Sequence, residues 1–345
     1  MRLKISRFAK VCIEIMLLGL LVVLFIKLLD YQSLQQYITL ITLRVVIGVL
    51  CFQLAILLLQ TCQWHLIMRE AGISRGLWRT FWARISGFSL TYLTPSMYFG
   101  GEPVRASLLK DNGMSYQKLY ATIALDKYIE LFTKLPCILV GFSLLIFLAH
   151  PSITLIIIAG AILLVFIAFF LFLMVKLFSG GLFIVGFVKR LLRPFTRINP
   201  RFVVKIIRAV REFAMDLHEI ISTKKIFYLA MLLGFAVSVV EVFQTFYILT
   251  ILGRTYLPLP HSFVIFSSVV IQGLIGILPG NLGGMEGTHL FVFNILWIGA
   301  SMSLVYTIIL RIGQMTMVMI GILNIIFWRI VTFQRRGADR NRTDA

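Results

Sequence analysis

Two short stretches in opposite halves of the chain combine helix-breaking residues with a carboxylate. Residues 94–103 read TPSMYFGGEP and residues 278–287 read LPGNLGGMEG, with the same separation between proline and glutamate. Both border strongly apolar sequence, where unpaired backbone groups and carboxylates need polar partners. Helix breaks at corresponding places in two halves of a membrane protein indicate an intramembrane substrate site. The residues expected to break the helices and line that site are Pro95, Gly100, Gly101, Pro279, Gly280, Asn281, Gly283 and Gly284.

Ionisable side chains inside or beside apolar runs give the second signal. Asp126, Glu130 and Lys134 recur every four residues and therefore share one helical face. Each charge at membrane depth costs about 2.5–3.5 kcal/mol on insertion scales, so such residues face one another or water. The set predicts a polar cavity for a zwitterionic or anionic head group. The residues expected to bind it are Glu102, Arg105, Asp126, Lys127, Glu130, Glu286 and Arg311.

Internal ion pairs between helices are the alternative interpretation of these charges. Glu130 with Lys134, or Glu102 with Arg105, would be examples of such pairs. Lys134 fits a snorkelling position, and Glu241 is the weakest member of the set. The glycine pairs would in that case only allow close helix crossing. Roughly balanced charges next to both breaks favour the cavity.

Other site chemistry is absent from the sequence pattern. The five histidines and four cysteines show no HExxH or CxxC spacing. No GxSxG, P-loop or Rossmann pattern occurs in a suitable setting. We therefore expect no metal and no cofactor, and we interpret His289, just after the second break, as a packed histidine rather than a proton carrier.

The elements that must position these residues are membrane helices. The chain has 345 residues, of which 59% are hydrophobic, and its mean hydropathy is +0.95. Its formal net charge is +19, but the basic residues lie between apolar runs, which indicates membrane topology rather than nucleic-acid binding. Six apolar runs reach the ~20 residues needed to cross a bilayer. They are residues 11–29, 43–62, 120–149, 153–178, 226–252 and 303–333.

Charge asymmetry sets the predicted topology. Basic residues lie before the first run, after the second and last runs, and along the connection 179–225, which places both termini in the cytoplasm. Shorter apolar pieces flank each break, at 77–94 with 104–109 and at 263–278 with 288–300. The expected fold is an all-α polytopic membrane protein with about six full transmembrane helices and two re-entrant hairpins in an inverted repeat. Full crossing of both interrupted pairs, giving about ten spans, fits the same charges.

The connection 179–225 contains an amphipathic pattern. Asn199 and Pro200 form a helix start, after which apolar residues recur on one face and basic residues lie off it. We expect a cytoplasmic amphipathic helix on anionic leaflet lipids. The alternative is packing against the underside of the bundle. The predicted organisation is one integral membrane domain, 1–333, followed by a short basic cytoplasmic tail, 334–345.

The two breaks also resemble a known family. The motifs Gly100-Gly101-Glu102-Pro103-Val104-Arg105-Ala106 and LPGNLGGMEG at 278–287, with Asp126, Lys127, Glu130 and Arg311, resemble the flippase-like transmembrane family typified by the membrane half of lysylphosphatidylglycerol synthetases. The resemblance implies an integral inner-membrane protein that moves polar lipids between leaflets. We expect no counterpart here of the soluble aminoacyl-transferase domain of the bifunctional synthetases, so lipid synthesis is not implied. Where the family pattern more often has Glu-Arg, this chain has Asp126-Lys127, and lysine lacks the planar fork for bidentate phosphate binding.

Three functions remain open from the sequence. A lipid translocator would use Arg105, Lys127 and Arg311 on a head-group phosphate, with the acidic residues holding those bases or binding an amine. A membrane-embedded transferase acting on a lipid carrier would use Glu102 or Glu286 as general base. An accessory scaffold would recruit an envelope-pathway partner through the basic connection. A homo-oligomer is compatible with each of them.

Overall fold

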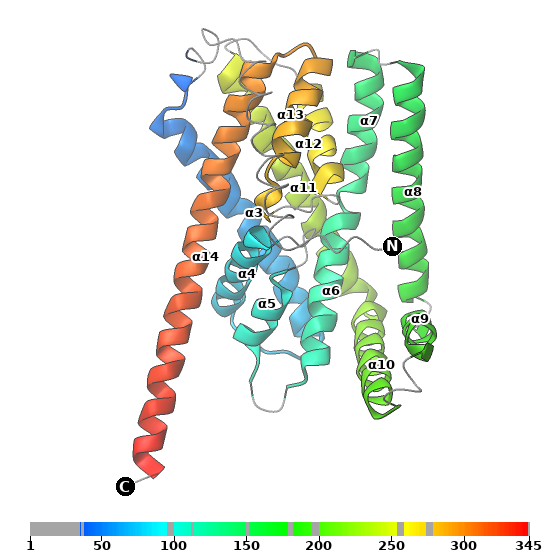
Figure 1. Ribbon diagram of the computed structural model, residues 1–345, viewed down its shortest axis with the longest axis vertical. Helices are drawn as coiled ribbons and strands as arrows, with labels where there is room; N and C mark the ends of the chain where they lie inside the picture. Colours follow the sequence, from blue (N-terminus) through cyan, green and yellow to red (C-terminus); the bar gives the residue numbers. More distant parts are fainter. Residues whose placement is uncertain are drawn as a thin grey trace, which may run out of the picture.

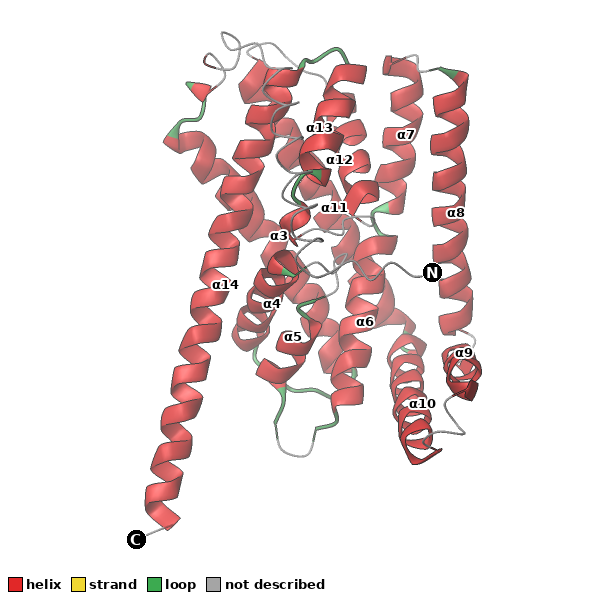
Figure 2. Cartoon of the chain, in the orientation of Figure 1, coloured by secondary structure: helices red, strands yellow, loops and turns green. Residues whose placement is uncertain are grey.

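The described part of the chain is helical and contains no strand (Figure 2). The computed structural model describes residues 35, 38–94, 100–111, 114–149, 152–178, 182–194, 200–253, 259–273 and 279–343. The helices are α3 (Leu43–Glu70), α4 (Leu77–Leu93), α5 (Glu102–Leu109), α6 (Tyr116–Phe132), α7 (Leu135–Ala149), α8 (Ile153–Phe178), α9 (Leu182–Leu192), α10 (Pro200–Ser222), α11 (Lys224–Gly253), α12 (Leu259–Gly273), α13 (Gly284–Ile295) and α14 (Ala300–Thr343), with a 3₁₀ turn, η2 (Pro279–Asn281).

Five helical stretches among the described residues are long and apolar enough to cross a membrane. They are Leu43–Glu70, Tyr116–Ala149, Ile156–Lys176, Lys224–Gly253 and Ala300–Trp328. Five of the six predicted runs are therefore confirmed as membrane-capable helices, while the run at 11–29 lies outside the described residues. Only 11% of the Ile156–Lys176 stretch is buried, so α8 presents apolar side chains on most of its surface, as a lipid-facing helix does.

One predicted span consists of two helices. The run at 120–149 is divided between α6, which ends at Phe132, and α7, which begins at Leu135. Pro136 lacks a backbone N–H, and its ring excludes the carbonyl four residues earlier, which is that of Phe132. At the end of α6, the carbonyl oxygen of Ile129 accepts from the hydroxyl of Thr133 at 2.8 Å and from its backbone N–H at 2.9 Å.

The two interrupted segments form pairs of short helices. α4 packs against α5, and α12 packs against α13. Figure 1 shows the first pair below the second pair in the view. α4 also contacts η2, so the second break lies against the first pair. Whether each pair is re-entrant stays a prediction.

Close helix crossings fix the bundle around these pairs. A Cβ atom at Gly321 of α14 would collide with the Ser89 hydroxyl and the Ile85 carbonyl of α4. A Cβ atom at Gly141 of α7 would likewise collide with Ser267 and the Phe263 carbonyl of α12. Small residues at such crossings let helix backbones approach within van der Waals contact. Each interrupted pair is therefore held by a membrane-capable stretch.

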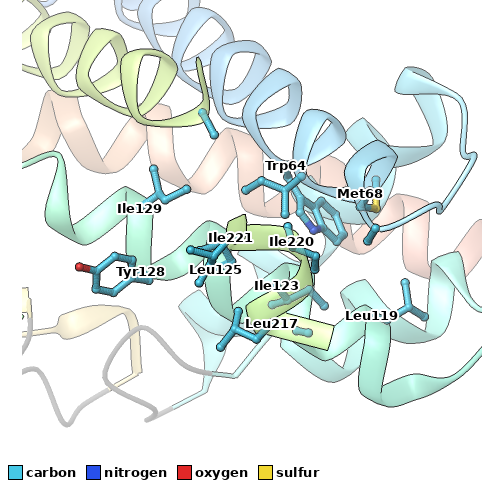
Figure 3. Close-up of a cluster of buried hydrophobic side chains, with 14 of the residues drawn as sticks. Trp64, Met68, Leu119, Ile123, Leu125, Tyr128, Ile129, Leu217, Ile220 and Ile221 are labelled. Atoms are coloured by element: carbon cyan, nitrogen blue, oxygen red, sulfur yellow. The ribbon is translucent and has the colours of Figure 1, made fainter. Parts of the chain in front are cut away.

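The amphipathic helix α10 packs on the bundle. Leu217, Ile220 and Ile221 join the buried cluster around Trp64 of α3 and Leu119 of α6, and Figure 3 shows the α10 side chains beside those of α6. The apolar face of α10 thus follows the alternative of packing on the bundle rather than the expected placement on a leaflet. Its basic side chains remain outward, with Arg201, Lys205, Arg208 and Arg211 exposed.

Candidate functional site

Asp126 of α6 is the centre of a buried ionic network. Its carboxylate is fully buried, at 0% exposure, and accepts hydrogen bonds from Nη1 of Arg84 at 2.9 and 3.0 Å. Nη2 of Arg105 donates to its Oδ2 at 2.7 Å, and Nε2 of Gln63 donates to its Oδ1 at 3.1 Å. An anion without counter-charges would not be stable in such a place, and two arginines supply them. The network joins α3, α4, α5 and α6.

Arg105 reaches Asp126 through a gap that glycine leaves open. A Cβ atom at Gly87 of α4 would collide with the Cγ and Cδ atoms of Arg105, so only glycine there admits its stem. The guanidinium lies over the ring of Trp64, 3.9 Å from its centroid, and this cation–π contact adds to the ion pair. Arg105 is only 4% exposed, and among the described residues its Nε has no hydrogen-bond partner.

The face of α6 carries two further carboxylate contacts. Glu130 pairs with Lys127 at 3.2 Å and with Nη2 of Arg84 at 3.5 Å. One turn later Lys134 pairs with Glu241 of α11. The pairs suggested by sequence proximity, Glu130 with Lys134 and Glu102 with Arg105, are not among the salt bridges within 4 Å that the described residues form. Both wrong pairings came from spacing along one helix, whereas the observed partners of Arg105 and Lys134 lie on other helices.

Arg311 of α14 holds the second break. Its Nε and Nη2 donate to Oε1 of Glu286 at 3.0 and 2.8 Å, and its Nη2 also donates to the carbonyl of Asn281 at 3.3 Å. Its Nη1 donates to the carbonyl of Gly280 and to the hydroxyl of Tyr92 on α4. Arg311 therefore satisfies backbone carbonyls that the broken helix leaves free, and it links the second break to the first pair.

The backbone of the second break needs its glycines. Gly280 has φ +60° and Gly283 has φ +79°, in the left-handed region where a Cβ atom is unfavourable, and Asn281 adopts φ +55°. The Asn281 and Gln272 amides exchange two hydrogen bonds of 2.6 and 2.8 Å. Glu286 completes the turn by accepting from the backbone N–H of Gly283 at 2.8 Å, which caps α13.

A cavity of about 300 Å³ lies between these groups. Its walls come from α3, α4, α5, α6, α11, α12, α13 and α14, and Gly280 and Asn281 of the second break border it. A volume at the lower end of ligand-pocket sizes fits a polar head group rather than a whole lipid. The charged side chains that line the cavity are Arg84, Glu102, Arg105, Lys127, Glu130, Lys134 and Glu241.

Comparison with known proteins identifies the family. The family model described as the lysylphosphatidylglycerol synthase TM region matches residues 11–321. The chain belongs to this family. It is also 26% identical over 267 residues to a UPF0104 membrane protein of Methanothermobacter thermautotrophicus, a match that covers 76% of this chain and 79% of that protein. No solved structure matches the chain.

Some expected site residues of this family member come together and others do not. Glu102, Arg105, Lys127 and Glu130 line the cavity, and Asp126 lies buried against two of the arginines around it. The other predicted binding residues, Glu286 and Arg311, pair with each other at the second break and are not among the lining side chains. At the first break, Gly100 and Gly101 precede α5, and Pro95 lies outside the described residues. At the second break, Pro279 begins η2, and Gly284 begins α13 and packs against Gln272.

Sequence reasoning missed Arg84 and underrated two other residues. Arg84 is one of the basic residues after the second apolar run that set the predicted topology, yet it is 5% exposed and ion-paired with Asp126. Lys134 does not snorkel but pairs with Glu241 in the cavity wall. The sequence signal that could have identified this residue is the position of Arg84 inside the largely apolar run 77–94. Among the described residues, no cluster of three or more His, Cys, Asp or Glu side chains could hold a metal.

Proposed function

We propose that this membrane protein translocates a polar lipid, or a lipid-linked head group, between the leaflets of the cytoplasmic membrane. The observation that carries the proposal is the cavity that α4, α5 and the second break share, lined by paired charges. Charged side chains at membrane depth face one another or an aqueous cavity, and they often mark a transport pathway. The family's description supports a lipid-related role for the membrane domain.

The two interrupted pairs act in this proposal as inverted re-entrant hairpins. At 1.5 Å per residue, the 15 residues of α12 and the 12 of α13 reach about 22 and 18 Å, short of a ~30 Å hydrocarbon core. Their location opposite α4 and α5 in Figure 1 supports entry from opposite faces. α4 and α5 would enter from the cytoplasmic face, which also carries both termini, α9 and α10. Inverted repeats permit alternating access when one half rocks against the other.

The head group would occupy the cavity while the acyl chains remain in the bilayer. Arg105 and Lys127 would engage a phosphate, since Arg105 combines a buried guanidinium with an unused Nε donor. The contacts of Arg311 with Glu286 and two backbone carbonyls support a positioning role that keeps the second break in shape. Its earlier assignment to a phosphate stays a prediction, as does the absence of enzymatic activity.

The outward basic face of α10 supports a second contact with lipid. Arg201, Lys205, Arg208 and Arg211 are exposed there, and juxtamembrane basic side chains attract anionic head groups. In this proposal α10 packs its apolar face on the bundle and touches anionic leaflet lipids with its basic side. A homo-oligomer or a partner from an envelope pathway remains compatible with both faces.

Leaflet exchange of fluorescent phospholipids in reconstituted vesicles tests the proposal. Val269→Trp is the decisive variant, because Val269 lines the cavity and the larger side chain fills it without removing a charge. Arg105→Gln is the companion variant, and Lys224→Gln, at an exposed position outside the cavity lining, is the matched control. We expect exchange by the wild-type protein and the control, and strongly reduced exchange by both cavity variants.

Gel filtration and thermal unfolding establish that each variant is folded before it is compared. Unchanged exchange by a folded Val269→Trp protein, or no exchange by the wild-type protein above protein-free vesicles, would refute translocation through this cavity.

A further inference from the structure

The charges of the cavity are almost all paired, and the exception is Glu102. Asp126 is held by Arg84 and Arg105, Glu130 by Lys127, and Glu241 by Lys134. Glu102, which is partly exposed, lines the same cavity, and no ion pair joins it to any residue that the structure describes. Among the described residues, this carboxylate in the cavity wall therefore lacks a cation.

The opposite imbalance lies one helical turn away. Three cations, Arg84, Arg105 and Lys127, share two carboxylates, Asp126 and Glu130, which leaves one positive charge in excess. The Nε of Arg105 is buried and has no acceptor among the described residues. Glu102 and Arg105 stand three positions apart on α5, so their side chains lie on one face of that helix.

We propose, building on the proposed function, that the site selects a zwitterionic head group that joins one phosphodiester to one primary amine by a short linker. The phosphate oxygens accept from Arg105 and balance the excess positive charge. The ammonium group pairs with Glu102. A ligand without net charge thus supplies both the anion for Arg105 and the cation for Glu102. The cavity lining has four cations and three carboxylates, and with the buried Asp126 the charges of the site sum to zero, which fits such a ligand.

Other head groups satisfy only part of this arrangement. An anionic phospholipid without an amine leaves Glu102 without a cation and brings a second negative charge near it. A head group with two amines and one phosphate adds a positive charge for which the described lining has no free carboxylate. Burial of an unpaired charge in a low-dielectric site is unfavourable, so both classes should bind more weakly.

Lipid-induced thermal stabilisation of the detergent-solubilised full chain measures this selectivity without requiring transport. The probes are phosphatidylethanolamine, phosphatidylglycerol and lysylphosphatidylglycerol with identical acyl chains. We expect phosphatidylethanolamine to bind about tenfold more tightly than either of the others, because a hydrogen bond to a charged group contributes on that order. Glu102→Gln should weaken phosphatidylethanolamine binding about tenfold and leave phosphatidylglycerol binding unchanged. Glu70→Gln, at the partly exposed end of α3 and outside the cavity lining, is the matched control and should keep the wild-type preference.

The outcomes separate this inference from the translocation proposal. Tighter binding of either of the other two lipids, equal stabilisation by all three, or an unchanged preference in the folded Glu102→Gln protein would overturn the zwitterionic assignment while leaving translocation open. Selective phosphatidylethanolamine binding together with no leaflet exchange would sustain the site and refute translocation.

Discussion

Replacing Asp126 by asparagine removes the buried negative charge that Arg84 and Arg105 share. The two side chains have nearly the same shape, so the change acts mainly on charge. Arg84 keeps Glu130 at 3.5 Å, whereas Arg105 loses the one ion pair that it forms with the described residues and stays 4% exposed. Breaking a buried ion pair by removing one partner costs about 3–5 kcal/mol. Each 1.4 kcal/mol corresponds to about a tenfold change in an equilibrium constant. The ratio of folded to unfolded protein should therefore fall by roughly two to three and a half orders of magnitude.

Equilibrium unfolding in mixed micelles with increasing sodium dodecyl sulfate, followed by tryptophan fluorescence, measures this loss. The double variant Asp126→Asn with Arg105→Met should lose less stability than the sum of the single variants, since the second change removes the charge that the first left unpaired. Asp111→Asn is the matched control. Its carboxylate is 48% exposed and pairs with Arg75, so its loss should be small and should shrink further in salt.

A free energy of unfolding for Asp126→Asn within about 1 kcal/mol of the wild-type value would contradict the proposed role of the ion pairs. The absence of coupling in the double-variant cycle would contradict it as well. Either result would mean that the arginines find other partners or that water reaches them.

Two further changes probe the packing around each break. Gly101→Ala should destabilise the protein by about 1–3 kcal/mol in the same unfolding assay, since its Cβ atom would collide with the Gly87 backbone. Gly76→Ala, where a Cβ atom meets nothing within 4 Å, should stay near the wild-type value. Arg311→Lys keeps the charge but loses the two-nitrogen contact with Glu286, and it should cost about 1–3 kcal/mol. Faster hydrogen exchange across 279–286 would report that loss, and unchanged exchange would contradict it.

The positions of the long helices follow from the sequence. Apolar runs long enough to cross a bilayer form α3, α8, α11 and α14, since backbone groups in lipid must bond within one segment. The helix interruptions could also be predicted, because proline and paired glycines disfavour the interior of a helix. Pro136 shows the limit of hydropathy, which runs through the break between α6 and α7 without a change.

The partners of the charges could not be predicted in the same way. Arg84 reaches Asp126 because α4 and α6 both pack on α3, and Lys134 reaches Glu241 because α11 packs on α6. Such contacts depend on helix crossings between segments far apart in sequence, which periodicity along one helix does not contain. The amphipathic pattern of α10 likewise identified a buried face correctly but not the surface that buries it.

The contact between Gly87 and Gly101 has a mechanical consequence. The two backbones touch there, Gly101 donates its N–H to Thr91 at 2.9 Å, and the stem of Arg105 fills the remaining space. Moving α4 away from α5 would leave the buried stem of Arg105 without its packing contacts and would open a void between the two helices. We therefore expect α4 and α5 to move as one rigid unit, so that any rearrangement would shift this unit against the helices it contacts, α3, α6 and α14.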